Sequence, residues 1–144
     1  GVLHAVGVQG PLAAERGIDL EVEFSPRLVL SEAGPLFTVL SNGIRNAIEA
    51  VGRGGRVLVA AELVRNGPGY HEVQIDVVDD GPGPPEEAWR VFSLDYTTKR
   101  HGPGVGLALS KAILEEMGGE ISLEGREDGG RGARLRIRYR EEHA

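Results

Sequence analysis

The chain has 144 residues, of which 40% are hydrophobic and 26% charged, and its formal net charge is −6. This length and balance suit one globular domain with its own core, and the acidic charge argues against a nucleic-acid-binding module. The sequence contains no cysteine, which excludes disulfides and cysteine-based metal sites, and it shows no signal peptide or membrane-length apolar run. We therefore expect a cytoplasmic domain, whose parent protein would reach a membrane only outside this segment.

The N-terminal part of the chain predicts one helix and two strands. Pro11–Gly17 is typical of a short helix that ends at a glycine, whereas residues 2–6 fit either the end of a helix or a strand. Ile18–Phe24 alternates between apolar and polar residues, which predicts a half-buried strand. A second short strand is expected at Leu28–Leu30.

The longest predicted helix runs from about Pro35 to Val51. Asn42 and Asn46 are four residues apart, so they lie one turn apart, and Glu49 is on the same side. Asparagine is a poor helix former, so two aligned in mid-helix suggest a ligand-binding role, with a solvated polar face as the alternative. The opposite side forms an apolar face of Leu36, Leu40, Ile44, Ala47, Ile48 and Val51.

Two further strands, at residues 57–64 and 72–78, are joined by a predicted turn and followed by Asp79. Gly81 and Gly83 complete an Asp-x-Gly-x-Gly pattern at this strand end. Glycines let the backbone approach a ligand closely, and the carboxylate could accept a hydrogen bond from a ligand amino group. An ordinary acidic turn is the alternative.

After a short predicted helix at residues 84–91, residues 92–104 lack periodicity and predict a mobile loop. Gly102, Gly104 and Gly106 then begin a helix that ends near residue 117, with Lys99 just upstream. Backbone N–H groups at a helix N-terminus attract phosphate, so this is a candidate phosphate-binding loop, and a glycine-containing flexible loop is the alternative. The spacing matches neither the dinucleotide-binding fingerprint nor the Walker A loop.

The C-terminal part predicts two strands, Glu120–Glu124 and Ala133–Tyr139, joined as a hairpin through residues 128–132. The three motifs above, together with Phe92 and Thr97-Thr98-Lys99 in the predicted loop, resemble the catalytic ATP-binding domain of bacterial sensor histidine kinases. That domain belongs to a superfamily with the DNA gyrase ATPases, MutL and the Hsp90 chaperones. The resemblance covers about residues 15–140 and rests on Asn-x-x-x-Asn, Asp-x-Gly-x-Gly, Phe…Thr-Thr-Lys and Gly-x-Gly-x-Gly.

The resemblance implies a two-layer α/β sandwich, the Bergerat fold, with a mixed and mostly antiparallel sheet packed against helices. It implies a single domain over residues 1–144, with residues 1–14 as a candidate end of a linker from an upstream domain. ATP would bind between the helices and a lid.

The resemblance also implies a role for each matching residue. Asn46 would ligate Mg²⁺, Asn42 would face the γ-phosphate, and Asp79 would bind the adenine amino group. Gly81 and Gly83 would let adenine approach, and Asn42, Asn46 and Lys99 would serve catalysis. The remaining nucleotide contacts would come from Glu49, Phe92, Tyr96, Thr97, Thr98, Lys99, Arg100, Gly102, Gly104, Val105, Gly106 and Leu107.

The chain departs from the family pattern at three places. Residues 93–96 replace a run that is often Glu-Pro-Phe-Phe, Ala50 stands where many members carry an aromatic residue, and Glu49 stands where many carry lysine. These changes put lid packing and nucleotide affinity in doubt, but they remove none of the groups for metal, adenine or phosphate.

The implied function is to bind Mg-ATP and to donate its γ-phosphate to a histidine on a separate dimerisation and phosphoacceptor domain, which then serves a response regulator. None of His4, His71, His101 and His143 has the context of the acceptor, and we interpret His71 as a loop residue. One alternative is a hydrolase of the gyrase or MutL kind, although those proteins carry a glutamate at the position of Asn42. The other is a nucleotide-binding partner module, such as an anti-sigma factor or a degenerate kinase.

Overall fold

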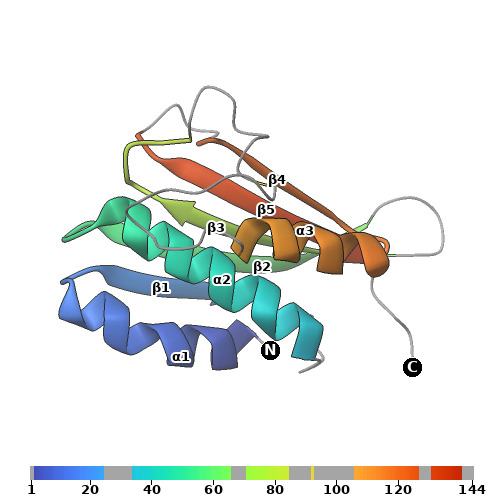
Figure 1. Cartoon of the computed structure of the whole chain (residues 1–144), viewed down its shortest axis with the longest axis horizontal. Coiled ribbons are helices and arrows are strands. Elements are labelled where there is room, and N and C mark those ends of the chain that lie inside the picture. The colour runs from blue at the N-terminus through green and yellow to red at the C-terminus, as the bar shows by residue number, and fades with distance from the viewer. Residues whose placement is uncertain are drawn as a thin grey trace.

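The structure, a computed structural model, describes residues 2–24, 34–65, 71–84, 92, 106–126 and 131–140. Within them, one five-stranded sheet has the order β1-β2-β3-β5-β4, and three helices lie on one of its faces (Figure 1). The sheet and the helices form the two layers of an α/β sandwich, as expected. The strands are β1 (Asp19–Phe24), β2 (Arg56–Arg65), β3 (His71–Asp79), β4 (Glu120–Gly125) and β5 (Ala133–Arg140).

The sheet is mixed and mostly antiparallel, which confirms the expected arrangement. β1 runs parallel to β2, while β2–β3, β3–β5 and β4–β5 are antiparallel pairs. β3 and β5 are neighbours although about 60 residues separate Ile75 from its partner Ile137. This pairing brings the beginning of β5 to the end of β3, where Asp79 lies.

The helix α1 (Val2–Glu15) is longer than the sequence predicts, and Pro11 lies inside it rather than at its start. Proline normally disfavours a helix interior, because it lacks an N–H group and crowds the preceding turn. Tertiary packing outweighs this cost, because Ala13 is buried in the core and Gln9 Nε2 donates a 2.8 Å hydrogen bond to Ser41 Oγ on the next helix. The helix ends at Glu15, and Gly17, with a φ of 64°, follows it as the glycine predicted to stop the helix.

The helix α2 (Gly34–Val51) forms the centre of the helical layer. Five of the six apolar residues predicted for its inner face are buried, and Val51 is partly buried against the same core. These side chains pack against alternate residues of the strands, such as Val59, Ile75 and Ile137. The buried residues of the predicted face are Leu36, Leu40, Ile44, Ala47 and Ile48.

The helix α3 (Gly106–Glu116) lies beside α2 on the same face of the sheet (Figure 1). Its Leu114 is fully buried in the core. None of the described helices is both long enough and apolar enough to cross a membrane.

The predicted loop position of His71 is wrong, because His71 is the first residue of β3 and pairs with Arg65 of β2. The hairpin pairing extends one residue beyond the expected strand, which neither residue's own propensity reveals. The predicted strand at 28–30, the turn at 66–69 and the helix at 84–91 lie wholly or largely outside the described residues.

Candidate functional site

Asp79 is the last residue of β3, and its position in the strand puts its side chain on the face that forms the core. Alternation along the strand produces this placement, because Val73, Ile75 and Val77 are buried on the same face. Asp79 is itself only 6% exposed. Its Oδ1 accepts hydrogen bonds from the N–H groups of Gly81, at 2.9 Å, and Ala133, at 3.3 Å.

The neighbouring carboxylate of Asp80 has a different environment. Its Oδ1 accepts a 3.0 Å hydrogen bond from the backbone N–H of Arg56 at the beginning of β2. Asp80 therefore ties the loop to the beginning of β2, and Asp79 is the acid on the face that the helical layer covers. The geometry thus distinguishes two adjacent acids that the residue types alone leave equivalent.

The protonation of Asp79 reflects its burial. Removal from water raises the pKa of its carboxyl above the ordinary value, since the charged form loses hydration. The N–H donors of Gly81 and Ala133 work in the opposite direction and lower the pKa, because they stabilise the carboxylate. Asp80 raises the pKa of Asp79 further, and Arg126 lowers it. A buried carboxylate with oriented donors is suited to accept a hydrogen bond from a ligand amino group.

The loop after β3 contacts the last turn of α2. Gly81 is buried, and a side chain at this position would place its Cβ 3.1 Å from the carbonyl oxygen of Ala50. Gly83 has a φ of 97°. This close approach brings Asp79 and Gly81 to the C-terminal end of the helix that carries the two predicted asparagines.

Asn42, Asn46 and Glu49 are all half-buried on α2, which agrees with a polar stripe beside the buried face rather than a fully solvated one. Arg45 Nε donates a 3.0 Å hydrogen bond to Glu49 Oε1, and the Glu49 side chain is 11% exposed against 60% for Arg45. Amide oxygens and a carboxylate are hard donors of the kind that Mg²⁺ takes. The stripe is thus chemically suited to a hydrated cation.

The predicted glycine loop leads into α3, whose first helical residue is Gly106. Leu107 is partly buried and packs against the core. Phe92 also packs against the core, and it lines a shallow pocket together with Ala108, Lys111 and Ala112 of α3. The other predicted lid and loop residues, Tyr96, Thr97, Thr98, Lys99, Arg100, Gly102, Gly104 and Val105, lie outside the described residues.

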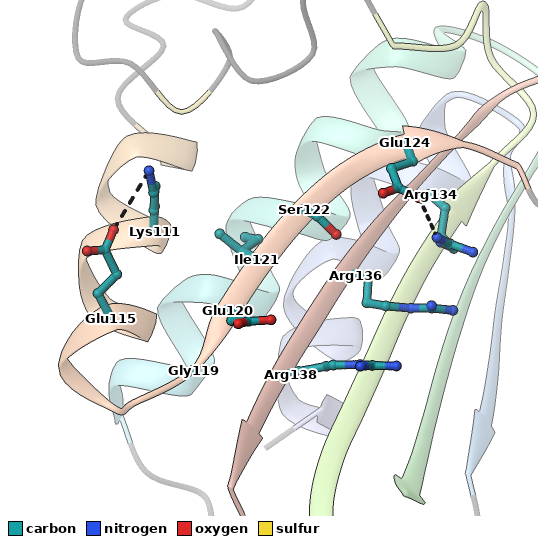
Figure 2. Close-up of a pocket in the computed structure, with 10 residues that line it drawn as sticks. All are labelled: Lys111, Glu115, Gly119, Glu120, Ile121, Ser122, Glu124, Arg134, Arg136 and Arg138. Carbon is teal, nitrogen blue, oxygen red and sulfur yellow. Dashed lines mark hydrogen bonds and ion pairs between the residues drawn. The ribbon is translucent and has the colours of Figure 1, made fainter. Parts of the chain in front are cut away.

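A surface pocket of about 440 Å³ lies elsewhere, around the edge strand β4 (Figure 2). Lys111 and Glu115 are on one side of β4, and three arginines of β5 extend on the other side. These arginines are engaged within the sheet: Arg134 with Glu124 at 2.8 Å, Arg136 with both oxygens of Asp76 at 2.8 and 2.9 Å, and Arg138 with Gln74 at 2.8 Å. None of the predicted site residues that the structure describes lines this pocket, so it is not the candidate nucleotide site.

The residues at and just before the beginning of β5 that support the Asp79 loop are absent from the sequence-based prediction. Arg131 Nε donates a 3.2 Å hydrogen bond to the carbonyl oxygen of Gly81, and Ala133 donates to Asp79. The 131–133 segment reads as the end of a hairpin, and no local pattern indicates a partner about 50 residues away. The pairing of β3 with β5 is the feature that would have indicated it.

Residues 32–143 match the family described as histidine kinase-, DNA gyrase B- and HSP90-like ATPase. Among curated relatives, the two-component sensor PhoQ of Pseudomonas aeruginosa is 39% identical over 129 residues, which cover 87% of this chain and 27% of that protein. The sensor histidine kinase ZraS of Klebsiella oxytoca is 34% identical over 126 residues, which cover 85% of this chain and 26% of that protein. The chain thus spans about a quarter of the length of these relatives.

Solved structures of histidine kinases share the fold. The nucleotide-free catalytic domain of histidine kinase ThkA superposes with a TM-score of 0.81 at 28% identity, covering 96% of this chain and 88% of that one. Full-length ShkA in complex with AMPPNP gives a TM-score of 0.77 at 28% identity, covering 96% of this chain and 28% of that one. With the family match over residues 32–143, these likenesses show that the chain belongs to the family of histidine kinase-, DNA gyrase B- and HSP90-like ATPases.

Proposed function

We propose that this chain is the ATP-binding catalytic domain of a two-component sensor histidine kinase. It binds Mg-ATP and donates the γ-phosphate to a histidine on a separate dimerisation and phosphoacceptor domain, from which a response regulator takes it. The observation that supports this best is the buried Asp79 carboxylate, held by two backbone N–H groups beside the helix that carries Asn42 and Asn46. The names of the relatives, which are sensor kinases, support the same assignment.

In this proposal, Asp79 accepts a hydrogen bond from the adenine amino group, and Gly81 lets the base approach the loop. A 6% exposed carboxylate favours a partner that donates a hydrogen bond, because an unpaired buried charge is costly. Adenine offers such a donor at its amino group, whereas guanine presents a carbonyl oxygen at the same position. The site should therefore prefer adenine nucleotides.

Asn46 would hold Mg²⁺ through its amide oxygen, and Asn42 would face the γ-phosphate. When bound, the cation would neutralise phosphate charge. Magnesium retains several waters and needs few protein ligands, so one half-buried amide oxygen suits it. Glu49 lies one turn further along, where its partner Arg45 holds it. The proposed lid and phosphate-binding residues at 92–106 complete the site, with Lys99 beside the phosphates.

Catalysis in this proposal comes from positioning and charge neutralisation rather than from a base on this chain. Asn42 cannot act as a general base, because an amide carries no titratable proton acceptor at neutral pH. A hydrolase that activates water with a carboxylate at that position is therefore disfavoured. We place the domain, over residues 1–144, in the cytoplasm, where ATP and a response regulator are available.

The test of the metal assignment is titration calorimetry with ATP, in the presence and absence of Mg²⁺. We expect tight binding to require Mg²⁺ in the wild type, and Asn46→Ala to lose that Mg²⁺ dependence while the fold is kept. Arg53→Ala, at an exposed position after the helix, is a control that should bind as the wild type does. Equal binding with and without Mg²⁺ in the wild type would refute the assignment.

A further inference from the structure

The segment that begins β5 reaches back to the loop that carries Asp79. Ala133 donates its N–H to Asp79 Oδ1 at 3.3 Å, and Arg131 Nε donates to the carbonyl oxygen of Gly81 at 3.2 Å. Arg126, at the end of β4, in turn donates a 3.3 Å bond to the carbonyl oxygen of Arg131. The first two bonds each span 50 or more positions of the sequence, and both reach the short segment 79–81 at the end of β3.

Gly132 makes this approach sterically possible. A Cβ at Gly132 would stand 1.8 Å from the carbonyl oxygen of Asp79 and 2.9 Å from the Cα of Asp80. Its φ of 127° also lies in the region that side chains rarely adopt. The obstructing atoms belong to backbone, so an added methyl group cannot be accommodated by a side-chain rotation, and the loop must move.

The close approach of residues 131–133 also affects how the Asp79 carboxylate is oriented. In the described part of the chain, both hydrogen bonds to the Asp79 carboxylate go to Oδ1. The N–H groups of Gly81 and Ala133 both hold that oxygen, so Oδ2 is the one left to accept from a ligand. The donor from Gly81 is local, but the donor from Ala133 depends on where β5 begins.

We propose that Arg131, Gly132 and Ala133 are positioning residues for adenine recognition, because they fix the Asp79 carboxylate and the Gly81 backbone from the neighbouring strand. This inference rests on the proposed function. It adds a dependence of base selectivity on the β4–β5 hairpin, a segment that none of the nucleotide motifs includes. None of the three residues needs to touch the nucleotide for this effect.

The experiment measures the affinities for ADP and for inosine diphosphate, which lacks the 6-amino group. We expect the wild type to prefer ADP and Gly132→Ala to lose most of that preference, because its carboxylate is misaligned. Arg131→Ala should weaken ADP binding about threefold to tenfold, the scale of one hydrogen bond, with a smaller loss for inosine diphosphate. A merely structural role would weaken both nucleotides equally.

Matched controls separate steric displacement from backbone strain and from loss of charge. Gly118→Ala changes a glycine with a φ of 73° that has open space around it, so it carries the conformational cost without the collision. Lys111→Ala removes an exposed cation on α3. Both should keep the ratio of the two affinities. If Gly132→Ala does not fold, the ADP and inosine diphosphate affinities of Arg131→Ala provide the test.

Amide hydrogen exchange of the nucleotide-free chain tests whether Arg131, Gly132 and Ala133 hold the Asp79 loop in place. This test does not depend on the proposed function. The N–H groups of Gly81 and Ala133 should be protected in the wild type and in Gly118→Ala but exchange faster in Gly132→Ala or Arg131→Ala. Unchanged protection together with an unchanged ADP preference in both variants would overturn the inference. A wild type that shows no preference for ADP while the exchange results hold would instead refute the adenine assignment.

Discussion

At the scale of single residues, Asp79 is the buried ionisable group through which the site would bind adenine in our proposal. It is a carboxylate inside the protein, and it accepts hydrogen bonds from two backbone N–H groups. These bonds offset only part of the cost of burying its charge. A ligand donor would offset more of it. Asp79→Asn should therefore weaken ADP binding by about 2–3 kcal/mol, the scale of a hydrogen bond to a buried charge.

Calorimetry checks this expectation, and Asp76→Asn is an informative comparison. Asp76 is on the same strand but on the opposite face, where it pairs with Arg136. That variant should lose stability and keep its nucleotide affinity. Equal affinities of Asp79→Asn and the wild type for ADP would refute the adenine assignment.

The raised pKa of Asp79 also predicts how stability depends on pH. The folded state holds this proton more tightly than the unfolded chain, whose ordinary pKa is 3.8. The favourable contribution is therefore full below that value and is lost as pH rises through the folded pKa. The free energy of unfolding of Asp79→Asn, relative to the wild type, should increase as pH is raised from about 3.8 towards neutrality.

Urea denaturation at several pH values measures this difference. A difference between Asp79→Asn and the wild type that stays constant or declines over this range would contradict the burial argument.

At the scale of elements, α2 combines a structural face with a functional stripe. Ile44 is fully buried, whereas Asn46, two positions on, is half-buried and polar. Ile44→Ala should lower the free energy of unfolding by about 2–4 kcal/mol, because it leaves a cavity in the core. Asn46→Ala should change it by less than about 1 kcal/mol, since alanine favours the helix. Chemical denaturation of both variants distinguishes the two faces, and similar losses in both would contradict this division.

Helix α2 also shows why much of the fold is readable from the sequence. Local signals predicted the correct elements in several places. They are the apolar period of α2, the alternation in β1, β3 and β5, and the glycine that follows α1. The extent of α1 was not readable, because Pro11 signals a helix start and only packing on α2 carries the helix through it. His71 was misplaced for a similar reason, since its partner across the hairpin defines its strand.

The site residues also fall into those that short sequence motifs predict and those that only the tertiary structure reveals. Asp79, the two asparagines and their surroundings follow from spacing within short motifs, and the structure brings the loop of Asp79 to the end of α2. The contacts from Arg131 and Ala133 depend on the pairing of β3 with β5, which no window of the sequence contains. Sequence reasoning therefore identifies the groups that would touch a ligand more readily than the groups that hold them in place.

At the scale of the whole molecule, neither histidine that the structure describes has the context expected of a phosphoacceptor. His4 is on α1, but Ala5 rather than an acid follows it. His71 begins a strand in the sheet, and its half-buried side chain is not on a helix of the kind that carries the acceptor histidine in sensor kinases. The nucleophile in our proposal is on another domain, which is consistent with a chain that spans 27% of the PhoQ sensor. The isolated chain should thus bind ATP without consuming it quickly.

The most direct test mixes this chain with the phosphoacceptor domain of its parent protein and ATP radiolabelled on the γ-phosphate. Our account predicts one labelled histidine on the acceptor domain, with an acid-labile and base-stable linkage, and no labelling when Asn46→Ala replaces the wild type. The chain alone should release phosphate slowly. Rapid phosphate release by the isolated chain, or tight ATP binding that never labels the acceptor, would contradict the proposal and favour a hydrolase or a docking module respectively.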